Sequence, residues 1–570
     1  MTSTSSPTSP PTAAQSPTRP GAGWWSPGRL VVLAALAYAL LAATVVGLDR
    51  ELRWDEVTYL AQVTPGQPDV WFGPQRARGM TVVLLPVALL GAPLTLLRGW
   101  LIAVHAIALV LAFRPWARVA GWTGGAAAAL AAVGWVPLYF AVEGYPNLLA
   151  AFAAVAAAAY SLAWIRRGGG QPDGVDERRL GPVDRDLVGA AIAIAIIAWL
   201  RPTESVWTAA ALTPVMIIAA GWRSWRVLAA YAAGGFIGWL PWLVEAILRF
   251  DGPLGRLAAA RATSASGASR NSLIQYLNLI EGPVRRVVDD PVLTGPALAL
   301  LVGAGVLAVI GLLARAGAAD ELAQARGPAR AAGARRAAAL TGAFTAAALV
   351  TPYLVLNAGI NLRYLLPGML LATLPVGAGL AVLVANSWQA RRGLGGLALA
   401  GLAVLYAVTL GWQLTLAARN AAEIAPLQAR PVAIGEALAE AADGAPCAFL
   451  SDAQWPEIQW HSGCLGEVLD AANPLLQCHD ARRDLAALAA DGYRVFVFGR
   501  QEPPFSPAVA GWPVTPLPDV PGGWWLHERP DGPGPDDPPT IPSPEDSTTP
   551  CPPSRAPDTD DAQLTFRWTR

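Results

Sequence analysis

The stretch LVVLAALAYALLAATVVGL, residues 30–48, decides the fold, and the charged residues DRE follow it at once at 49–51. An uncharged, mostly apolar run of this length crosses the hydrocarbon core of a bilayer when it forms a helix. The run follows Arg19 and Arg29 and can be mistaken for a cleaved signal peptide. Because further apolar runs follow, we interpret it as an uncleaved first membrane helix.

The rest of the chain repeats this pattern. It is 54% hydrophobic and only 14% charged, whereas a soluble domain carries nearer a quarter charged residues. The segments expected to be membrane helices lie at about 30–48, 99–113, 119–141, 145–165, 187–200, 205–222, 226–248, 293–314, 338–356, 364–386 and 394–418. The predicted fold class is therefore mainly α, a polytopic membrane bundle of about 11 spanning helices. Acids and bases balance at 41 each, so no basic field indicates a nucleic acid partner.

Segment 80–97 decides on which side each later loop lies. It is apolar, but Pro86 and Pro93 interrupt it. If it does not span, the arginine-rich loops between the later helices all fall on the side of the N-terminus, in agreement with the positive-inside rule. We therefore predict that 80–97 is a re-entrant or interfacial element on the outer face. The N-terminus is then cytoplasmic, and everything after residue 418 lies outside the cell membrane.

This topology sets the domain boundaries. Residues 1–28 are rich in Ser, Thr and Pro, and residues 529–570 are rich in Pro and Asp, so both are predicted to be disordered tails. Residues 29–418 are predicted to form the transmembrane domain, with outer loops at 49–98 and 249–292.

A small extracytoplasmic α/β domain is predicted at 430–528. Residues 446–450 and 493–498 (YRVFVF) are typical of buried strands, and residues 434–442 and 481–490 are typical of helices. No glycine-rich nucleotide fingerprint opens either helix, so nothing supports a cofactor role for this domain.

All four cysteines lie outside the predicted membrane segments. Cys447, Cys464 and Cys478 fall close together, and Cys551 lies in the tail. This pattern favours a disulfide in an oxidising compartment, but the sequence does not say which residues pair.

Two adjacent carboxylates, Asp55 and Glu56, follow the first membrane helix in RWDEVTYL (53–60). A carboxylate near the bilayer is costly unless it is solvated, paired or used in function. One of the two can act as a general base on a hydroxyl, and the other can orient it or bind a cation. The alternative is a solvated loop start in which Arg50 or Arg53 provides an ion pair.

The pair in this position resembles the GT-C membrane glycosyltransferases, which include the protein O-mannosyltransferases and the lipid A aminoarabinose transferases. Three further stretches are similar to members of this superfamily: EGYPN at 143–147, RPTE at 201–204 and NLRYLLP at 361–367. The resemblance covers residues 30–418 in architecture, and its motifs are short.

The resemblance implies an enzyme that moves a sugar from a polyprenyl-phosphate-linked donor to an acceptor hydroxyl, with inversion, on the outer face of the membrane. The catalytic role falls on Asp55, with Glu56 beside it, and a divalent metal, if any, would be held there. Because arginine offers a planar fork to phosphate, Arg363 is the first candidate to bind the lipid phosphate and Arg201 the second. Tyr364, next to Arg363, is a further candidate for binding substrate.

Two features of the outer face allow two interpretations each. Glu143 can position the acceptor or a metal, or it can simply favour the dipole of the helix that begins near Pro146. The arginine-rich loop 249–292 can bind an anionic partner such as a lipid phosphate, or it can be a solvated loop with its own acidic counter-charges.

Two other classes of function compete with the glycosyltransferase. A lipid or small-molecule transporter or flippase often shows internal repeats and broken helices at the membrane midplane, and we find no convincing repeat. A non-catalytic envelope assembly protein could retain the fold, but the intact Asp-Glu pair argues against it. The sequence does not identify the sugar, or whether the acceptor is a glycan, a lipid or a protein.

Overall fold

The computed structural model describes residues 26–68, 70, 72–169, 184–220, 224–264, 291–313, 328–356, 362–390, 394–451, 455–468, 489, 491–499, 512–518, 520 and 523–529. The predictions for the two terminal tails, for a helix at 481–490 and for most of the outer loop 249–292 therefore lie largely outside the described residues.

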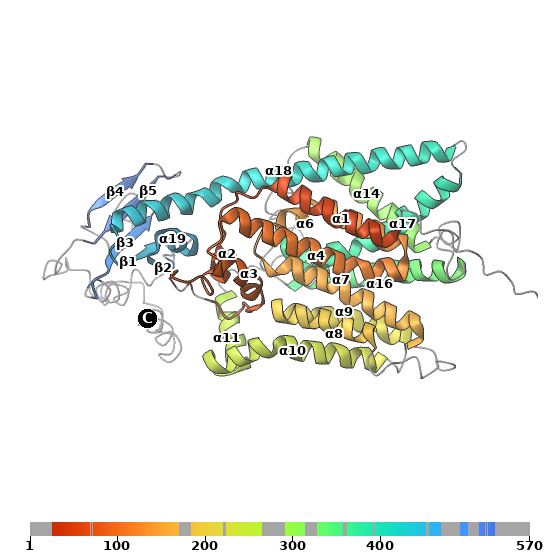
Figure 1. Ribbon diagram of the computed structural model, residues 1–570, viewed down its shortest axis with the longest axis horizontal. Coiled ribbons are helices and arrows are strands. Elements are labelled where there is room, and N and C mark those ends of the chain that lie inside the picture. The colour runs from red at the N-terminus through yellow and green to blue at the C-terminus, as the bar shows by residue number, and fades with distance from the viewer. Residues whose placement is uncertain are drawn as a thin grey trace, which may run out of the picture.

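Most of the chain is a bundle of helices, with a small sheet at one end (Figure 1). The helices of the bundle are α1 (Pro27–Leu41), η1 (Ala42–Val46), α2 (Trp54–Leu60), α3 (Gly79–Leu89), α4 (Leu94–Ala120), α5 (Trp122–Val133), α6 (Trp135–Phe140), α7 (Pro146–Trp164), η2 (Ile165–Gly169), α8 (Arg185–Leu200), α9 (Pro202–Ala220), α10 (Trp225–Arg249), α11 (Pro253–Ser264), α14 (Pro291–Leu313), α16 (Pro328–Leu356), η6 (Leu362–Leu365), α17 (Leu366–Gln389) and α18 (Leu394–Ala442).

In the described part of the chain, six helices are long and apolar enough to cross a membrane: Pro27–Val46, Leu94–Ala120, Pro146–Arg167, Trp225–Arg249, Leu362–Trp388 and Leu394–Ala442. The protein is thus a multi-pass membrane protein. All eleven predicted segments contain helix, but the expected count of about 11 spans is not confirmed. Segment 119–141 is not one helix, because the extended backbone of Gly134 separates α5 from α6.

Segment 80–97 forms the short helix α3 and the start of α4. Helix α3 has 11 residues, which at 1.5 Å per residue is about 16 Å, roughly half the thickness of the hydrocarbon core. The chain turns at Gly91, which has a positive φ of 57°, and α4 then begins at Leu94. These lengths agree with the expectation that α3 does not span the membrane by itself.

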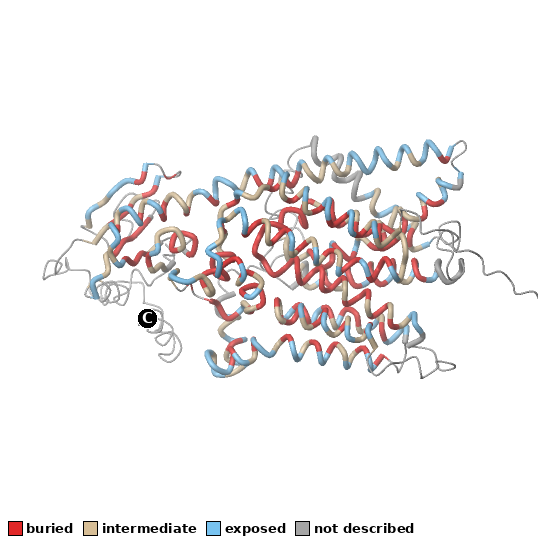
Figure 2. Tube along the Cα trace, in the orientation of Figure 1, coloured by how far each residue is buried: buried red, intermediate tan, exposed pale blue. Residues whose placement is uncertain are grey.

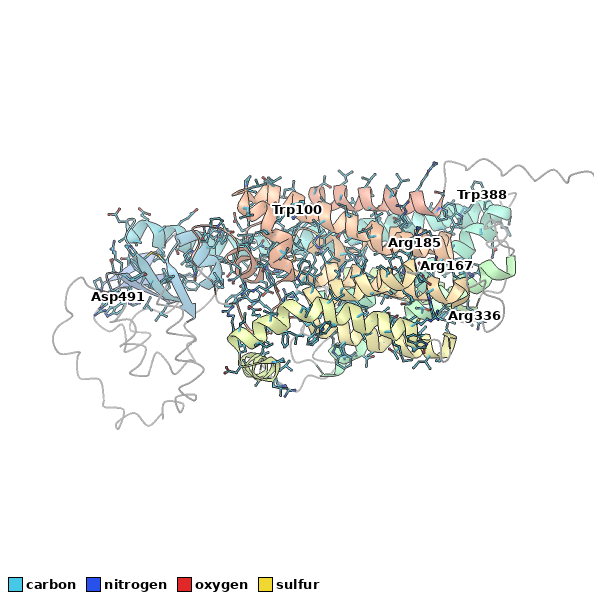
Figure 3. The ribbon with its side chains drawn as sticks, turned by 60° about the horizontal axis from the view of Figure 1, so that its bottom comes forward. Trp100, Arg167, Arg185, Arg336, Trp388 and Asp491 are labelled. Atoms are coloured by element: carbon cyan, nitrogen blue, oxygen red, sulfur yellow. A yellow bond between two sulfur atoms is a disulfide. The ribbon has the colours of Figure 1, made fainter. Side chains whose placement is uncertain are left out.

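Figure 3 shows where several charged side chains lie along the bundle. Arg167, Arg185 and Arg336 lie at one end, and Asp491 of the C-terminal domain lies at the other (Figure 3). These three arginines border two of the five arginine-rich loops that the positive-inside rule placed together, so the described ends of these two loops lie at the same end of the bundle. Buried residues concentrate in its middle, whereas the outer faces of α10 and α18 are exposed (Figure 2). Exposed leucines such as Leu248 (76%) and Leu397 (72%) need lipid, rather than water, around them.

The C-terminal domain is a five-stranded sheet of order β2-β1-β3-β5-β4. Its elements are β1 (Cys447–Ser451), α19 (Trp455–Ser462), β2 (Leu465–Val468), β3 (Arg494–Gly499), β4 (Val514–Leu517) and β5 (Trp524–Glu528). Strand β1 pairs in parallel with β2 and β3, and β5 pairs antiparallel with β3 and β4. The strands predicted at 446–450 and 493–498 are confirmed as β1 and β3. A disulfide joins Cys447 to Cys464, as the cysteine pattern suggested.

The helix predicted at 434–442 is not a separate element. It is the end of α18, which has 49 residues and runs unbroken from the bundle to the sheet (Figure 1). At 1.5 Å per residue its length is about 70 Å. One continuous helix therefore carries the C-terminal domain.

Helices α8 and α10 pack at a distance that only glycine permits. A Cβ on Gly234 would lie 2.1 Å from the carbonyl oxygen of Ala191, and a Cβ on Gly238 would lie 2.2 Å from the carbonyl oxygen of Ala195. This four-residue spacing of small residues is the usual way in which membrane helices bring their backbones together.

We predict that Gly234→Ala and Gly238→Ala each lower the thermal unfolding temperature in detergent, because the added methyl group forces α8 and α10 apart. Gly235→Ala is the matched control, since a Cβ there meets only a methyl group of Ile194 at 3.9 Å. Equal unfolding temperatures for the three variants would contradict this account of the packing.

Candidate active site

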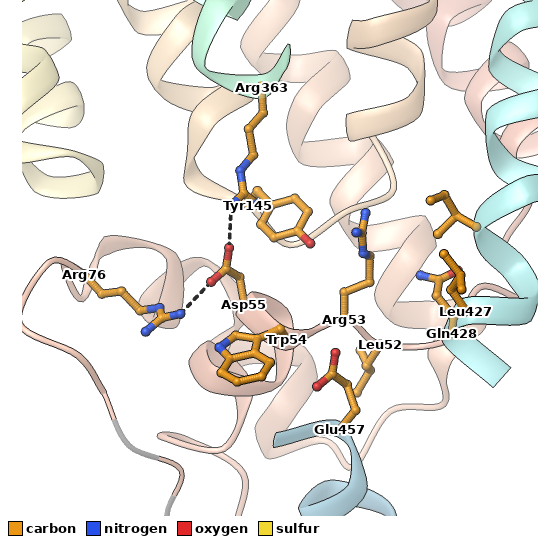
Figure 4. A pocket seen from close by; sticks show the side chains of 11 residues that line it. Leu52, Arg53, Trp54, Asp55, Arg76, Tyr145, Arg363, Leu427, Gln428 and Glu457 are labelled. Atoms are coloured by element: carbon orange, nitrogen blue, oxygen red, sulfur yellow. Dashed lines mark hydrogen bonds and ion pairs between the residues drawn. The ribbon is translucent and has the colours of Figure 1, made fainter. Parts of the chain in front are cut away.

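Asp55 lies between two guanidinium groups (Figure 4). Its Oδ1 is 2.7 Å from Nη2 of Arg76, and its Oδ2 is 2.9 Å from Nη2 of Arg363. The three side chains are only 11–21% exposed. The structure therefore brings together Asp55 and Arg363, which lie far apart in the sequence, and adds Arg76, which the sequence analysis did not single out.

The two arginines control the ionisation of Asp55. Burial alone would raise the pKa of its carboxyl, but Arg363 and Arg76 outweigh burial and lower this pKa to about 2. Asp55 is thus ionised at neutral pH and is a weak base while both arginines remain beside it. A ligand that draws either guanidinium away would raise its basicity.

Three of the sequence motifs meet at this point. Arg363 lies in the turn η6, just before α17, and its guanidinium lies over the ring of Tyr145, 4.4 Å from the ring centroid. Tyr145 caps the N-terminus of α7 in the EGYPN stretch. A planar guanidinium over an aromatic face is attracted by the ring quadrupole, so Tyr145 holds Arg363 toward Asp55.

Arg201 and Tyr364 form a layer behind Arg363. The Nε of Arg201 is 2.5 Å from Oε1 of Glu204, and its guanidinium lies over Tyr364, 5.1 Å from the ring centroid. Tyr364 in turn stacks on Tyr353, with ring centroids 5.5 Å apart. Neither Arg201 nor Tyr364 lines the cavity beside Asp55.

Glu56 belongs to a different environment from that of its neighbour. It is 1% exposed, and its carboxylate accepts hydrogen bonds from both terminal nitrogens of Arg98. It also accepts from the backbone N–H of Gly144 at 2.6 Å and of Arg53 at 3.0 Å. Glu56 therefore ties the start of α2 to α4 and to the EGYPN turn.

Glu143 is fully buried and lies outside the cavity. Its Oε1 is 3.2 Å from Nη2 of Arg50, and that same nitrogen donates to Oη of Tyr139 at 2.8 Å. Glu143 thus compensates a buried cation.

The acidic residues do not fit a divalent metal site. Asp55 and Glu56 face different arginines and do not converge on one point. Within the described ranges, no three His, Cys, Asp or Glu side chains lie close enough together to hold a metal ion.

A cavity of about 400 Å³ opens beside Asp55. It is lined by Leu52, Arg53, Trp54, Asp55, Arg76, Tyr145, Arg363, Ile424, Leu427, Gln428 and Glu457. This volume is within the range of small-molecule sites. The side chains come from the start of α2 and the segment before it, from the loop before α3, from α18 and α19, and from the turns before α7 and α17. The membrane domain and the C-terminal domain therefore both contribute.

The cavity carries an excess of positive charge. Among the described residues, the guanidinium of Arg53 hydrogen-bonds only Oη of Tyr139, at 3.4 Å. Burial raises the pKa of Glu457 to about 8, so this carboxyl is mostly neutral at pH 7. Three arginines therefore face one ionised carboxylate, which leaves two positive charges for an anionic ligand to balance.

The described part of the loop 249–292 supports Arg76. Arg256 is fully buried and donates to the carbonyl oxygens of Pro74 at 3.0 Å and Arg76 at 2.8 Å. It also pairs with Glu245 at 3.0 Å. Arg256 thus fixes the segment that carries Arg76.

Sequence reasoning missed Arg76, Gln428 and Glu457, and it treated Arg53 only as a partner for the acidic pair. The sequence did offer a signal for Arg76, because it is an arginine in a loop predicted to lie outside, against the positive-inside trend. No sequence pattern indicated a role for Glu457, since only tertiary packing brings α19 to the cavity.

No protein family model matches the chain, and no curated protein does. Among solved structures, ArnT from Cupriavidus metallidurans bound to undecaprenyl phosphate matches with a TM-score of 0.54 and 15% identity, over 89% of this chain and 99% of ArnT. The apo oligosaccharyltransferase of Archaeoglobus fulgidus matches with a TM-score of 0.51 and 13% identity, over 84% of this chain and 70% of that one. The chain thus shares the fold of ArnT and of the archaeal oligosaccharyltransferase, in agreement with the fold that the resemblance implied.

We predict that Glu56→Gln lowers the free energy of unfolding by roughly 3–5 kcal/mol, because it leaves Arg98 as an unpaired buried charge. Glu440→Gln, at an exposed position of α18, should change it little. Thermal unfolding of both variants in detergent measures the difference, and equal stability would show that the Glu56–Arg98 pair has no structural role.

Proposed function

We propose that this protein is a membrane glycosyltransferase that moves a sugar from a polyprenyl-phosphate-linked donor to an acceptor hydroxyl on the outer face of the membrane. The observation that carries the proposal is Asp55, held by Arg76 and Arg363 in a cavity with excess positive charge. A phosphate group matches that charge, and an ionised carboxylate beside it can take a proton. The shared fold with ArnT and the archaeal oligosaccharyltransferase supports the same reading.

In the proposed reaction, the donor phosphate binds Arg363, with Arg76 and Arg53 nearby. The phosphate then competes with Asp55 for the guanidinium groups, so the carboxylate becomes a stronger base when the donor is present. Donor binding thus prepares the base, and Asp55 stays unreactive without it.

The chemical step is a displacement at the anomeric carbon. Asp55 takes the proton of the acceptor hydroxyl, and the acceptor oxygen attacks the anomeric carbon from the face opposite the phosphate. The bond between that carbon and the phosphate oxygen breaks, the phosphate leaves with the electron pair, and the configuration inverts. Arg363 stabilises the negative charge that grows on the departing phosphate.

The other candidate residues receive supporting roles in this proposal. Glu56 and Glu143 hold the backbone on which Asp55 and Tyr145 lie, through Arg98 and Arg50. Arg201 and Tyr364 support Arg363 from behind.

The proposal places the cavity and the C-terminal domain outside the cell. The disulfide between Cys447 and Cys464 supports this placement, because disulfides persist in oxidising compartments. A transporter would instead place its charged residues at the membrane midplane, whereas here they gather where the bundle meets the C-terminal domain (Figure 4).

We expect Asp55→Asn to lower sugar transfer by roughly 10²–10⁴-fold, because the amide keeps the shape of the side chain but cannot accept the proton. The assay uses purified protein in nanodiscs with a panel of polyprenyl-phosphate-linked sugars and measures the release of polyprenyl phosphate. Asp49→Asn, at an exposed position just beyond the first helix, is the control and should keep full activity. Turnover like that of the wild type in Asp55→Asn would refute the assignment.

We expect Arg363→Ala to weaken the binding of undecaprenyl phosphate roughly ten- to a hundredfold, as the loss of charge-assisted hydrogen bonds implies. Arg363→Lys should recover only part of the affinity, because it keeps the charge without the planar fork. Thermal-shift titration with undecaprenyl phosphate measures both variants, and Arg114→Ala, at an exposed position of α4 outside the loop 249–292, is the control. If Arg201→Ala weakens binding and Arg363→Ala does not, the phosphate site belongs to Arg201.

A further inference from the structure

Glu457 reaches the active-site cavity from the C-terminal domain. It lies in α19, is 4% exposed and lines the same cavity as Asp55 (Figure 4). Among the residues that the structure describes, its Oε2 has no hydrogen-bond partner. A buried polar atom without a partner is costly, so this oxygen indicates a ligand group that the proposed chemistry has not yet used.

The position of Glu457 is fixed by close packing. Helix α19 crosses α18 at Gly435, where a Cβ would lie 2.6 Å from Cβ of His461. Ile458 is fully buried next to Glu457, and the disulfide to Cys464 holds the chain just after the helix. Glu457 is thus held in place on both sides and cannot easily turn away from the cavity.

The carboxyl of Glu457 is mostly protonated at pH 7. Burial raises the pKa of its carboxyl to about 8, and the charge of Asp55 also raises it, whereas Arg53 and nearby backbone N–H groups lower it. Helix α18 contributes uncharged Gln428 to the same cavity, and His461 lies one turn further along α19. A protonated carboxyl both donates and accepts a hydrogen bond.

The groups around Glu457 suit a carbohydrate. The amide of Gln428, like a protonated carboxyl, offers both a donor and an acceptor, and its Nε2 is anchored on the carbonyl oxygen of Glu51 at 3.0 Å. Sugar hydroxyls also donate and accept. The indole of Trp54 adds an aromatic surface to the cavity wall, and the positive charge of Arg53 disfavours a cationic acceptor.

We propose that Glu457, together with Gln428 and Trp54, forms the acceptor subsite of this cavity, and that the acceptor group is a carbohydrate hydroxyl. This inference rests on the proposed glycosyltransferase function and adds the class of acceptor to it. The C-terminal domain then completes the active site, because the membrane domain alone supplies the donor side and Asp55.

The first test needs neither a donor nor turnover. Dicyclohexylcarbodiimide modifies protonated carboxyls in apolar surroundings, and peptide mass spectrometry locates the adduct. In full-length protein in nanodiscs, we expect Glu457 to be labelled at pH 6.5 and several-fold less at pH 9. Octyl glucoside below its micelle concentration should protect Glu457, whereas octyltrimethylammonium, with the same tail and a positive charge, should not.

The outcomes separate the acceptor subsite from other roles. Absence of labelling at pH 6.5, or equal labelling with and without octyl glucoside, would overturn the subsite. Equal protection by both amphiphiles would also overturn it, because the alkyl tail alone would then explain the effect. The exposed Glu440 should stay unlabelled at both pH values, which shows that labelling requires a buried, protonated carboxyl.

The second test uses sugar transfer to octyl glucoside. Glu457→Leu should raise KM for this acceptor by about tenfold or more, as the loss of a buried hydrogen bond implies, and should leave KM for the donor unchanged. Glu457→Gln keeps a hydrogen-bond donor, so it should stay within a few-fold of the wild type. We also expect the wild type to lose activity above about pH 8, where Glu457 ionises, and this variant to show no such loss. A rise in the donor KM instead would place Glu457 on the donor side.

Wild-type protein that turns over no polyprenyl-phosphate sugar would refute the proposed function, and the labelling result would still decide the carbohydrate subsite.

Discussion

The active-site region depends on one buried ion pair, that of Arg98 with Glu56. Arg98 is fully buried, and besides Glu56 it donates to the carbonyl oxygens of Arg50, Glu51 and Val142. One guanidinium thus connects the exit of the first membrane helix, the start of α2, helix α4 and the turn before α7. A charge buried this deeply is tolerated only when every donor has a partner, so these four segments have essentially one way to fit together.

This constraint explains how Arg53, Arg76 and Arg363 can lie close together where the bundle meets the C-terminal domain. With Glu56 committed to Arg98, the single carboxylate of Asp55 remains for Arg76 and Arg363, and Arg53 is left over. Such an arrangement is electrostatically unsatisfied in the free protein, and an anionic ligand relieves it. The supporting residues, among them Arg256 and Tyr145, keep the arginines from turning outward to water.

Much of the membrane domain could be predicted from the apolar runs, because a bilayer admits few alternatives to helices. The proximity of Asp55 and Arg363 also followed from sequence, since both stand at outer helix ends. The different surroundings of Asp55 and Glu56 did not, because successive residues of a helix point to different sides, and the sequence did not say which side held Arg98. The break at Gly134 and the arrival of Glu457 at the cavity both arise from packing between distant segments, and no local pattern reports such packing.

The unbroken helix α18 gives the bilayer a mechanical connection to the chemistry. Its first half is exposed to lipid, and residues Ile424, Leu427 and Gln428 further along form one wall of the cavity. A helix that is anchored in lipid at one end changes its tilt when the hydrocarbon thickness changes. A small tilt of α18 displaces the residues further along the helix by a larger distance. The width of the cavity therefore depends on the thickness of the membrane as well as on the protein.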